Sequence, residues 1–239
     1  GVQTCALPIY ALINQPGYLI DTLSIDSRRV IDLSSTLFFA IAGSRDDGHD
    51  YLNELQQEGL QCYVVQHIPH NLNTESLNII VVKDTVQALQ DLCAHHRECF
   101  NYPVIGITGS NGKTTTKELM AAVLSTTFKT HFTKGNLNNH IGIPLTLLEM
   151  PADTEIAVIE MGANHQLEIK GYCDYVEPDY GLITNVGKAH LEGFGGEEGV
   201  VKGKTELYEY IGRKGGVLFV NDRSEKLIER AFAFSVADK

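Results

Sequence analysis

The stretch GITGSNGKTTTKEL, residues 106–119, is the feature that most constrains how this chain folds. It joins an apolar run, VIGIT, to a segment with helical spacing, and the two glycines of the turn between them, Gly109 and Gly112, are followed by Lys113 and Thr114. A glycine-rich turn between a strand and a helix brings backbone N–H groups close to phosphate oxygens. A lysine and a hydroxyl placed beside it can reach the terminal phosphates and Mg²⁺. The pattern is GxxGK followed by Ser or Thr, because Ile107 stands where the strict Walker pattern has its first glycine. The residues predicted to bind phosphate are Thr108, Gly109, Ser110, Asn111, Gly112, Lys113, Thr114 and Thr115.

The part of the chain after Pro103 repeats the order strand, loop, helix. The apolar runs VIGIT, IAVIEM, YGLITNV and GVLFVN are rich in β-branched residues, and segments with helical spacing, including 113–125 and 200–211, lie between several of them. Such alternation is typical of a mainly parallel, doubly wound α/β sheet. Ligands of these sheets bind at the carboxyl ends of the strands, so the residues after each strand are the candidates for a site.

The part of the chain before residue 83 reads as a smaller α/β unit. The runs TLFFAIAG, CYVVQ and NIIVV predict strands, and residues 51–58 predict a helix that stops at Gly59. We expect an N-terminal domain over 10–83 and a central domain over 84–239, with a helix near 83–100 joining them. The first nine residues, GVQTCALPI, have none of the features of a signal peptide and match a translated sequencing adapter, so we expect residues 1–9 to be non-native.

Composition excludes several classes of protein. The formal net charge of −11 argues against sequence-independent nucleic-acid binding, which depends on clustered Lys and Arg. The five cysteines show no CxxC spacing, which favours free thiols in a reducing compartment over disulfides or a zinc site. No apolar run approaches the ~18 residues of a membrane span. We therefore expect a cytoplasmic protein without membrane insertion.

Polar residues follow the later strands as well. Glu160 ends an apolar run and could complete a Mg²⁺ shell, although a surface or capping acid would look the same. His190 lies in the loop TNVGKAHLEGFGG, ahead of a helix with Lys202 and Lys204, and a solvated loop histidine is the plainer interpretation. In GNLNNH, Asn138 and Asn139 could bind a polar ligand, or serve only the local turn.

The motifs together resemble the Mur ligase family. TGSNGKTTTKE, GNLNNHIGIPLTLL, EMGANH, ITNVGKAHLEGFG and KGKTELY occur in that family in this order and spacing, and the resemblance covers roughly residues 24–221. It implies a small α/β UDP-sugar-binding domain followed by a P-loop-type central domain that is incomplete here. It also implies ATP-dependent amide-bond formation through an acyl phosphate in peptidoglycan precursor synthesis. GANH with AHLEGFG points to the family member that joins D-Ala-D-Ala to a UDP-MurNAc-tripeptide.

The resemblance also implies roles for particular residues. It makes Lys113, Glu160, His190 and Lys204 the catalytic set. It assigns two Mg²⁺ ions to Thr114, Glu160, His190 and Lys204, and it adds Asn138 and Asn139 to the ATP-binding loop. Lys204 takes the position of the family's carbamylated lysine, with Lys202 as the alternative, since a carbamate is an anion that binds Mg²⁺. The substrate-binding residues carried over to the first domain are Ser27, Arg28, Asp47 and His49.

Other functions stay open at this point. A folylpolyglutamate-type ligase or another Mur-type ligase would share the loop, although the DSR motif (residues 26–28) of the first domain argues against the former. A P-loop switch and a non-catalytic nucleotide-sugar-binding module are further alternatives. The family has a third domain that this chain does not reach, so we expect the 239-residue chain not to turn over alone. We also expect a monomer.

Overall fold

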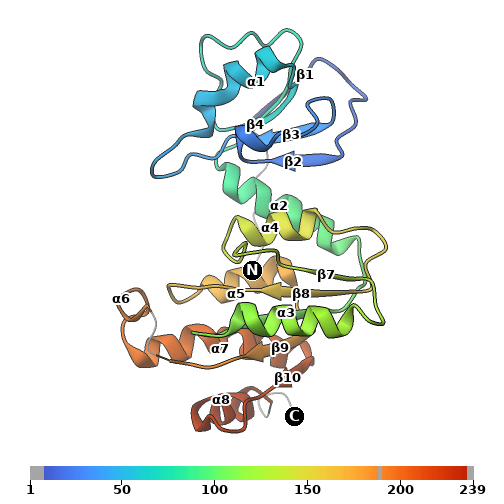
Figure 1. The fold of residues 1–239 in the computed structure, drawn as a ribbon. Coiled ribbons are helices and arrows are strands. Elements are labelled where there is room, and N and C mark those ends of the chain that lie inside the picture. Colours follow the sequence, from blue (N-terminus) through green and yellow to red (C-terminus); the bar gives the residue numbers. More distant parts are fainter. Residues whose placement is uncertain (1–7, 188–189, 236–239) are drawn as a thin grey trace. The chain divides into compact units, whose positions relative to one another are not determined.

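The computed structural model describes residues 8–187 and 190–235, and it divides the chain into two compact units. The units are Gly1–Leu92 and Cys93–Lys239, and the division falls within the helix α2 (Thr85–Glu98). Each unit has its own sheet and its own core (Figure 1). Of the segment expected to be non-native, Gly1–Leu7 lies outside the described residues.

The first unit is a five-stranded mixed sheet in the order β1-β5-β4-β3-β2. Four strands are parallel, and β1 pairs antiparallel with β5 at one edge. The strands are β1 (Tyr10–Ile13), β2 (Thr22–Ser24), β3 (Thr36–Phe39), β4 (Cys62–Val65) and β5 (Asn78–Val81), and the helical segments are η1 (Ser27–Arg29), η2 (Gly48–Tyr51) and α1 (Leu52–Glu58). The core forms because buried side chains of β3, β4 and β5 meet Leu52 and Leu55 of α1.

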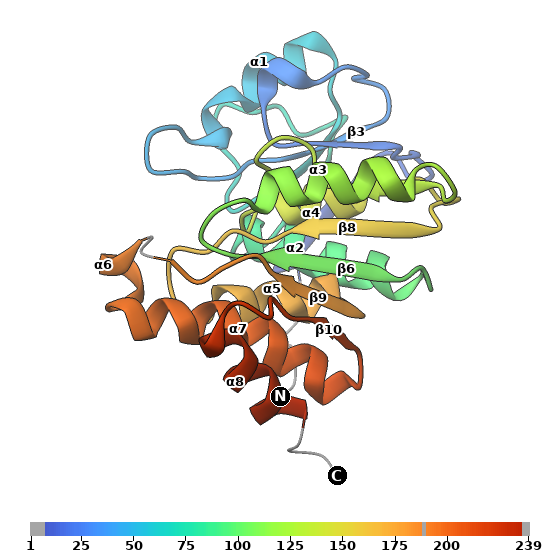
Figure 2. The ribbon, with the colours of Figure 1, turned by 60° about the horizontal axis from the view of Figure 1, so that its bottom comes forward.

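The second unit is a five-stranded sheet in the order β10-β9-β6-β8-β7, and all of its pairs are parallel. The strands are β6 (Val104–Thr108), β7 (Thr130–Phe132), β8 (Ile156–Glu160), β9 (Tyr180–Ile183) and β10 (Val217–Phe219). The helices that follow α2 are α3 (Lys113–Leu124), α4 (Gly142–Leu148), α5 (Glu168–Val176), α6 (Leu191–Phe194), α7 (Glu197–Lys214) and α8 (Glu225–Ser235). Figure 2 shows β8, β6 and β9 running side by side.

Alternate residues of β6 serve the two faces of this sheet, because successive side chains of a strand point in opposite directions. Val104 joins the large core made with α4, α5 and α7, whereas Ile105 and Ile107 join a smaller cluster with Met120 and Leu124 of α3. Helices on both faces define the doubly wound α/β class, so the predicted fold class is confirmed. Among helices within the described residues, none is both long and apolar enough to cross a bilayer.

The sequence prediction missed three short strands and misplaced the end of a fourth. The strands β1, β2 and β7 are only three or four residues long and are largely half-buried or exposed; β1 (YALI) is apolar but lies directly after the segment expected to be non-native, and β2 and β7 carry no apolar run. The run TLFFAIAG was expected to be one strand to Gly43, but β3 ends at Phe39. The chain then turns back, and an isolated bridge pairs Ala42 with Asp47.

Candidate active site

Three strand ends meet at one edge of the second sheet. The register pairs Ile107 of β6 with Glu160 of β8, and Thr108 of β6 with Ile183 of β9. The loops that follow β6, β8 and β9 therefore begin side by side, as expected for a site at the carboxyl ends of parallel strands.

The loop after β6 turns sharply at its two glycines. Gly109 has φ +144° and Gly112 has φ +76°, conformations that favour glycine. A Cβ at Gly109 would lie 2.0 Å from Thr184 Oγ1, so the loop packs directly against the segment after β9. Gly112 is the N-cap residue of α3, and no side-chain hydrogen bond caps the helix there. The backbone N–H groups of the first turn of α3 are therefore without a side-chain cap.

The segment that follows β9 holds the loop in shape. Ser110 N donates to Asn185 O at 3.0 Å, and the Ser110 hydroxyl both donates to Gly187 O and accepts from Gly187 N. Asn111 N donates to Asn185 Oδ1 at 3.1 Å, while Asn111 O accepts from Asn185 Nδ2 and Thr184 Oγ1. Thr184, Asn185 and Gly187 were not among the predicted site residues. Their position directly after the apolar run YGLI is the signal that could have identified them.

Three predicted residues, Lys113, Thr114 and Asn138, lie near the carboxylate of a fourth, Glu160. Glu160 is 1% exposed, and its Oε1 accepts hydrogen bonds from Thr114 Oγ1 at 3.2 Å and Asn138 Nδ2 at 2.8 Å. The Lys113 ammonium donates to Gly109 O at 2.8 Å. Burial lowers the pKa of Lys113, and the negative charge of Glu160 opposes that effect.

The other oxygen of this carboxylate suits a cation. Glu160 Oε2 is buried and has no hydrogen-bond partner within the described residues, and a buried anionic oxygen is costly unless something pairs with it. Mg²⁺ in nucleotide sites typically takes only one or two carboxylates, with waters and phosphates completing its shell. Thr114 and Glu160 fit such an ion. No group of three or more His, Cys, Asp and Glu side chains suited to holding a metal occurs in the described part of the chain.

Lys204 lies on α7 and is 2% exposed, whereas Lys202 is exposed on the same helix. Its ammonium donates to Ala163 O at 2.9 Å and lies 5.1 Å from the centre of the Phe194 ring. Burial lowers the pKa of Lys204 to about 8, and repulsion from Lys113 adds to the effect. A larger share of neutral amine near neutral pH is the condition that carbamylation requires, because CO₂ reacts with the neutral form. This favours Lys204 over Lys202 as the candidate for carbamylation.

The pH dependence of stability should report the buried Lys204. The folded pKa of about 8 lies below the ordinary 10.5, so between these values the unfolded chain binds more protons and the free energy of unfolding rises with pH. We expect wild type to gain stability relative to Lys204→Met from pH 8 to 10.5, measured by urea unfolding. Lys202→Met, on the exposed side of α7, is the control and should run parallel to wild type. If the free energy of unfolding of Lys204→Met changes with pH in parallel with that of wild type, the lowered pKa of Lys204 would be contradicted.

The remaining predicted residues of the second unit have different surroundings. The Thr108 hydroxyl donates to Met161 O, and Asn139 Oδ1 accepts from Ile141 N and Gly142 N at the start of α4. Thr115 is exposed in the first turn of α3. His190 is exposed, has φ +51° and precedes α6; within the described residues no hydrogen bond or ion pair joins its side chain to Glu160 or Lys204.

The substrate-binding residues predicted in the first unit lie in two capped turns. The Arg28 guanidinium binds Asp26 through two bonds of 2.9 Å, which hold the pKa of Asp26 below its usual range, and Ser27 is half-buried beside them. His49 is buried; its Nδ1 lies 2.6 Å from Asp47 Oδ1, and its Nε2 accepts from Gln66 N at 2.9 Å. Both ring nitrogens of His49 are therefore engaged within the protein, and Asp47 is the more accessible of this pair.

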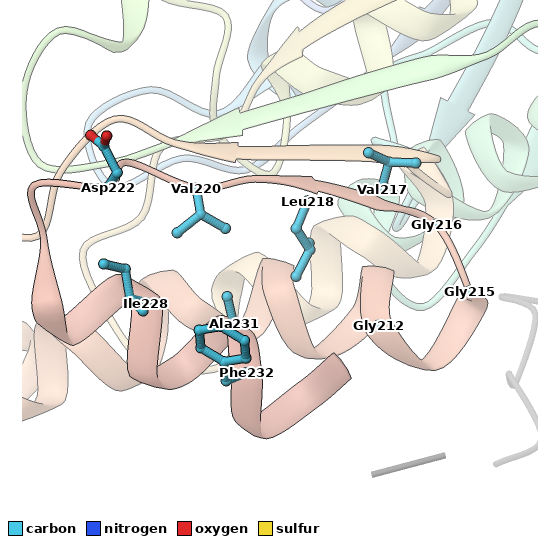
Figure 3. Close-up of a pocket in the computed structure, with 10 residues that line it drawn as sticks. All are labelled: Gly212, Gly215, Gly216, Val217, Leu218, Val220, Asp222, Ile228, Ala231 and Phe232. Carbon is cyan, nitrogen blue, oxygen red and sulfur yellow. The ribbon is translucent and has the colours of Figure 1, made fainter. Parts of the chain in front are cut away.

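An apolar pocket lies elsewhere in the second unit. It measures about 580 Å³ and lies between β10 and α8, where Leu218, Val220 and Ile228 line it (Figure 3). Asp222 is its charged side chain, and an apolar hollow with a carboxylate has no groups suited to a phosphate. We therefore place the candidate site by the strand-end chemistry of Lys113, Thr114 and Glu160.

The fold and this cluster together define a P-loop-type α/β unit with a lysine and a buried carboxylate at the carboxyl ends of neighbouring strands. Family models match both parts of the chain: the Mur ligase family catalytic domain over residues 19–97, and the Mur ligase middle domain over residues 107–236. The chain belongs to the Mur ligase family.

Individual relatives agree with this membership. The chain is 36% identical over 230 residues to the UDP-N-acetylmuramoyl-tripeptide–D-alanyl-D-alanine ligase of Bacillus subtilis. This aligned region covers 96% of the chain and 48% of the relative. It is 41% identical over 224 residues to the ligase of the same name from Haemophilus influenzae, covering 92% of the chain and 48% of the relative. The chain thus spans about half the length of these curated relatives.

Solved structures show the same likeness. A crystal structure of MurF from Acinetobacter baumannii superposes with a TM-score of 0.80 at 37% identity, covering 90% of this chain and 47% of that one. A MurF ligase from Thermotoga maritima in complex with ADP superposes with a TM-score of 0.72 at 32% identity, covering 82% and 44%.

Proposed function

We propose that this chain supplies the ATP site and the UDP-sugar-peptide site of a ligase that joins D-Ala-D-Ala to UDP-N-acetylmuramoyl-tripeptide. The observation that carries the proposal is the cluster of Lys113, Thr114 and Glu160 at the mouth of a glycine loop. Two further findings support it: relatives of that name at 36% and 41% identity, and the ADP complex of a solved neighbour.

The chemistry has two steps. The free carboxylate of the tripeptide attacks the γ-phosphorus of ATP, which forms an acyl phosphate and releases ADP. The amine of D-Ala-D-Ala then attacks the acyl carbon, and the amide forms as inorganic phosphate and a proton leave. Both steps bring anions together, so the protein contributes positioning and positive charge.

The residues of the loop suit the first step. The N–H groups at the start of α3 and the Lys113 ammonium face the place where a terminal phosphate would lie, and the helix dipole favours negative charge there. Lys113 would exchange its bond to Gly109 O for phosphate oxygens. Thr114 and Glu160 would hold Mg²⁺, which neutralises the charge that develops on the phosphates.

Lys204 suits a second role near the same phosphate. Its burial, with repulsion from Lys113 added, lowers the pKa of Lys204 and disfavours the ammonium form. As a carbamate it would be an anion, attracted to Lys113 and able to bind a cation. We propose that Lys204 works in this form, and that Asp47 and Arg28 of the first unit bind the nucleotide-sugar end of the substrate.

The test is phosphate release from ATP by the whole gene product. We expect release only when UDP-N-acetylmuramoyl-tripeptide and D-Ala-D-Ala are both present, with one amide formed for each phosphate. Release with a folate and glutamate instead would assign a different amide ligase. Release that needs neither acceptor would indicate a simple nucleotidase, and nucleotide binding without any release would indicate a binding module.

A further inference from the structure

Lys117 is a wholly buried lysine that the proposed chemistry does not use. It lies on α3 and is 0% exposed, which is rare for lysine because a buried charge is costly unless it is paired. Its ammonium donates to Thr133 O at 2.6 Å, lies 2.8 Å from Glu118 Oε1 and comes within 3.5 Å of Gly135 O. The buried charge thus has a full set of partners, two of which are backbone carbonyls of a single loop.

That loop, residues 133–138, contacts both the backbone and the carboxylate of Glu160 in the candidate site. At its start, Thr133 Oγ1 accepts from Glu160 N at 2.9 Å. At its end, Asn138 Nδ2 donates to Glu160 Oε1 at 2.8 Å, and Asn138 O accepts from Gly162 N at 2.7 Å. The loop therefore supports the Glu160 backbone, beside its pairing with β6, and helps to orient its carboxylate.

Helix α3 reaches Glu160 by two routes. Its first turn does so directly, through Thr114 Oγ1 at 3.2 Å. Lys117, one turn after Lys113, reaches Glu160 indirectly, through its hydrogen bond to Thr133 O of the loop. Because one helix carries both contacts, the distance between the phosphate-binding lysine and the carboxylate depends on the anchoring of Lys117.

We propose that Lys117 is a positioning residue that fixes the loop 133–138 to α3, so that Glu160 keeps one oxygen paired and the other free for the cation. The proposal deepens the proposed function, since the cation and nucleotide are those of that site. No contact of Lys117 with a ligand is required.

Hydrogen exchange in the ligand-free chain tests the anchoring without nucleotide. Lys117→Met removes the charge and keeps the length of the side chain. We expect the amides of Glu160 and Gly162, both bonded to the loop, to exchange at least about tenfold faster, while the central strand β6 keeps its protection. Equal acceleration throughout β6 and the loop would reduce Lys117 to a general stabilising residue and overturn the proposal.

Arg97→Met is the matched control. Arg97 is a second buried cation in the same unit, and it too donates to backbone carbonyls, those of Val176, Phe100 and Tyr102. Phe100 and Tyr102 precede the first residue of β6 and Val176 ends α5, whereas Glu160 pairs with Ile107 near the carboxyl end of β6. Its loss is expected to lower stability and to leave the relative exchange of Glu160 and Gly162 unchanged.

Binding of Mg²⁺ with a non-hydrolysable ATP analogue, measured by calorimetry, gives the functional arm. Groups that orient a metal ligand typically contribute about 10–100-fold to affinity, so we expect at least about tenfold weaker binding for Lys117→Met and less than about twofold for Arg97→Met. In an Asn138→Ala background the Lys117→Met effect should shrink, because the two changes disturb one path. If the losses in binding free energy caused by Lys117→Met and Asn138→Ala are fully additive, Lys117 does not act through Asn138 and that part of the proposal is overturned.

The two hypotheses fail in different ways. If wild type binds no nucleotide, the proposed function of the chain fails, and hydrogen exchange still decides on Lys117. If wild type binds and both Lys117→Met arms match Arg97→Met, the positioning role fails and the proposed function stands.

Discussion

Glu160→Gln is expected to weaken Mg²⁺-dependent nucleotide binding about a hundredfold while leaving the fold intact. A glutamine oxygen can accept both bonds that Glu160 Oε1 now accepts, from Thr114 and Asn138. Its amide group would take the place of Oε2, which has no partner within the described residues. The change removes a buried negative charge and keeps the packing, so the ligand-free variant should be at least as stable as wild type.

In the presence of Mg²⁺ and nucleotide, wild type should be more stable than Glu160→Gln. A ligand that binds only the folded state stabilises it by an amount that grows with the logarithm of its affinity, and we expect the variant to lose about a hundredfold in Mg²⁺ affinity. Thermal unfolding with and without the Mg²⁺ complex of an ATP analogue measures both effects. Glu155→Gln is the control, because Glu155 is exposed just before the amino end of the same strand. A Glu160→Gln variant that still gains stability from Mg²⁺ as wild type does would remove Glu160 from the cation site.

Lys113→Ala is expected to reduce ATP-dependent phosphate release by the whole gene product at least about a thousandfold, the scale seen when a cation that stabilises a transferring phosphoryl group is lost. Lys113 is the cation whose ammonium already lies over the glycine loop, bonded to Gly109 O. The assay is release in the presence of both proposed acceptor substrates.

Lys129→Ala provides the comparison for that result. Lys129 is exposed and forms an ion pair with Asp153, so its loss should change the rate by less than about twofold. Persistent release by Lys113→Ala, within tenfold of the control, would show that the loop does not hold the phosphate that is transferred.

The sequence predicted the second sheet well, because its signals are local and redundant. VIGIT is buried at all five positions and is followed at once by the glycine loop, so strand, loop and helix were each indicated independently. Glu160 was found in the same way, as the polar residue that ends an apolar run. The short strands β1, β2 and β7 gave no such signal, because edge strands need not be buried.

The finer structure of the site depended on contacts that the sequence does not show. Asn138 and Asn139 are adjacent and chemically identical, yet one reaches Glu160 and the other caps α4. Lys117 was missed although it shares a helical stripe with Ala121 and Leu124, a spacing that indicates burial. The reason for burying a lysine lies in a loop that starts sixteen residues later.

Residues after β9 hold the glycine loop in its conformation through hydrogen bonds. The loop motif therefore cannot be transferred to another protein without them. Ser110 and Asn111 take their conformation from Thr184, Asn185 and Gly187, more than seventy residues away in the chain. A segment grafted from residues 108–115 into another parallel sheet would carry its glycines and lysine but leave its brace behind. Substitutions in the glycine loop and in the segment after β9 should accordingly be correlated among related sequences, because a change in one segment is tolerated only with a matching change in the other.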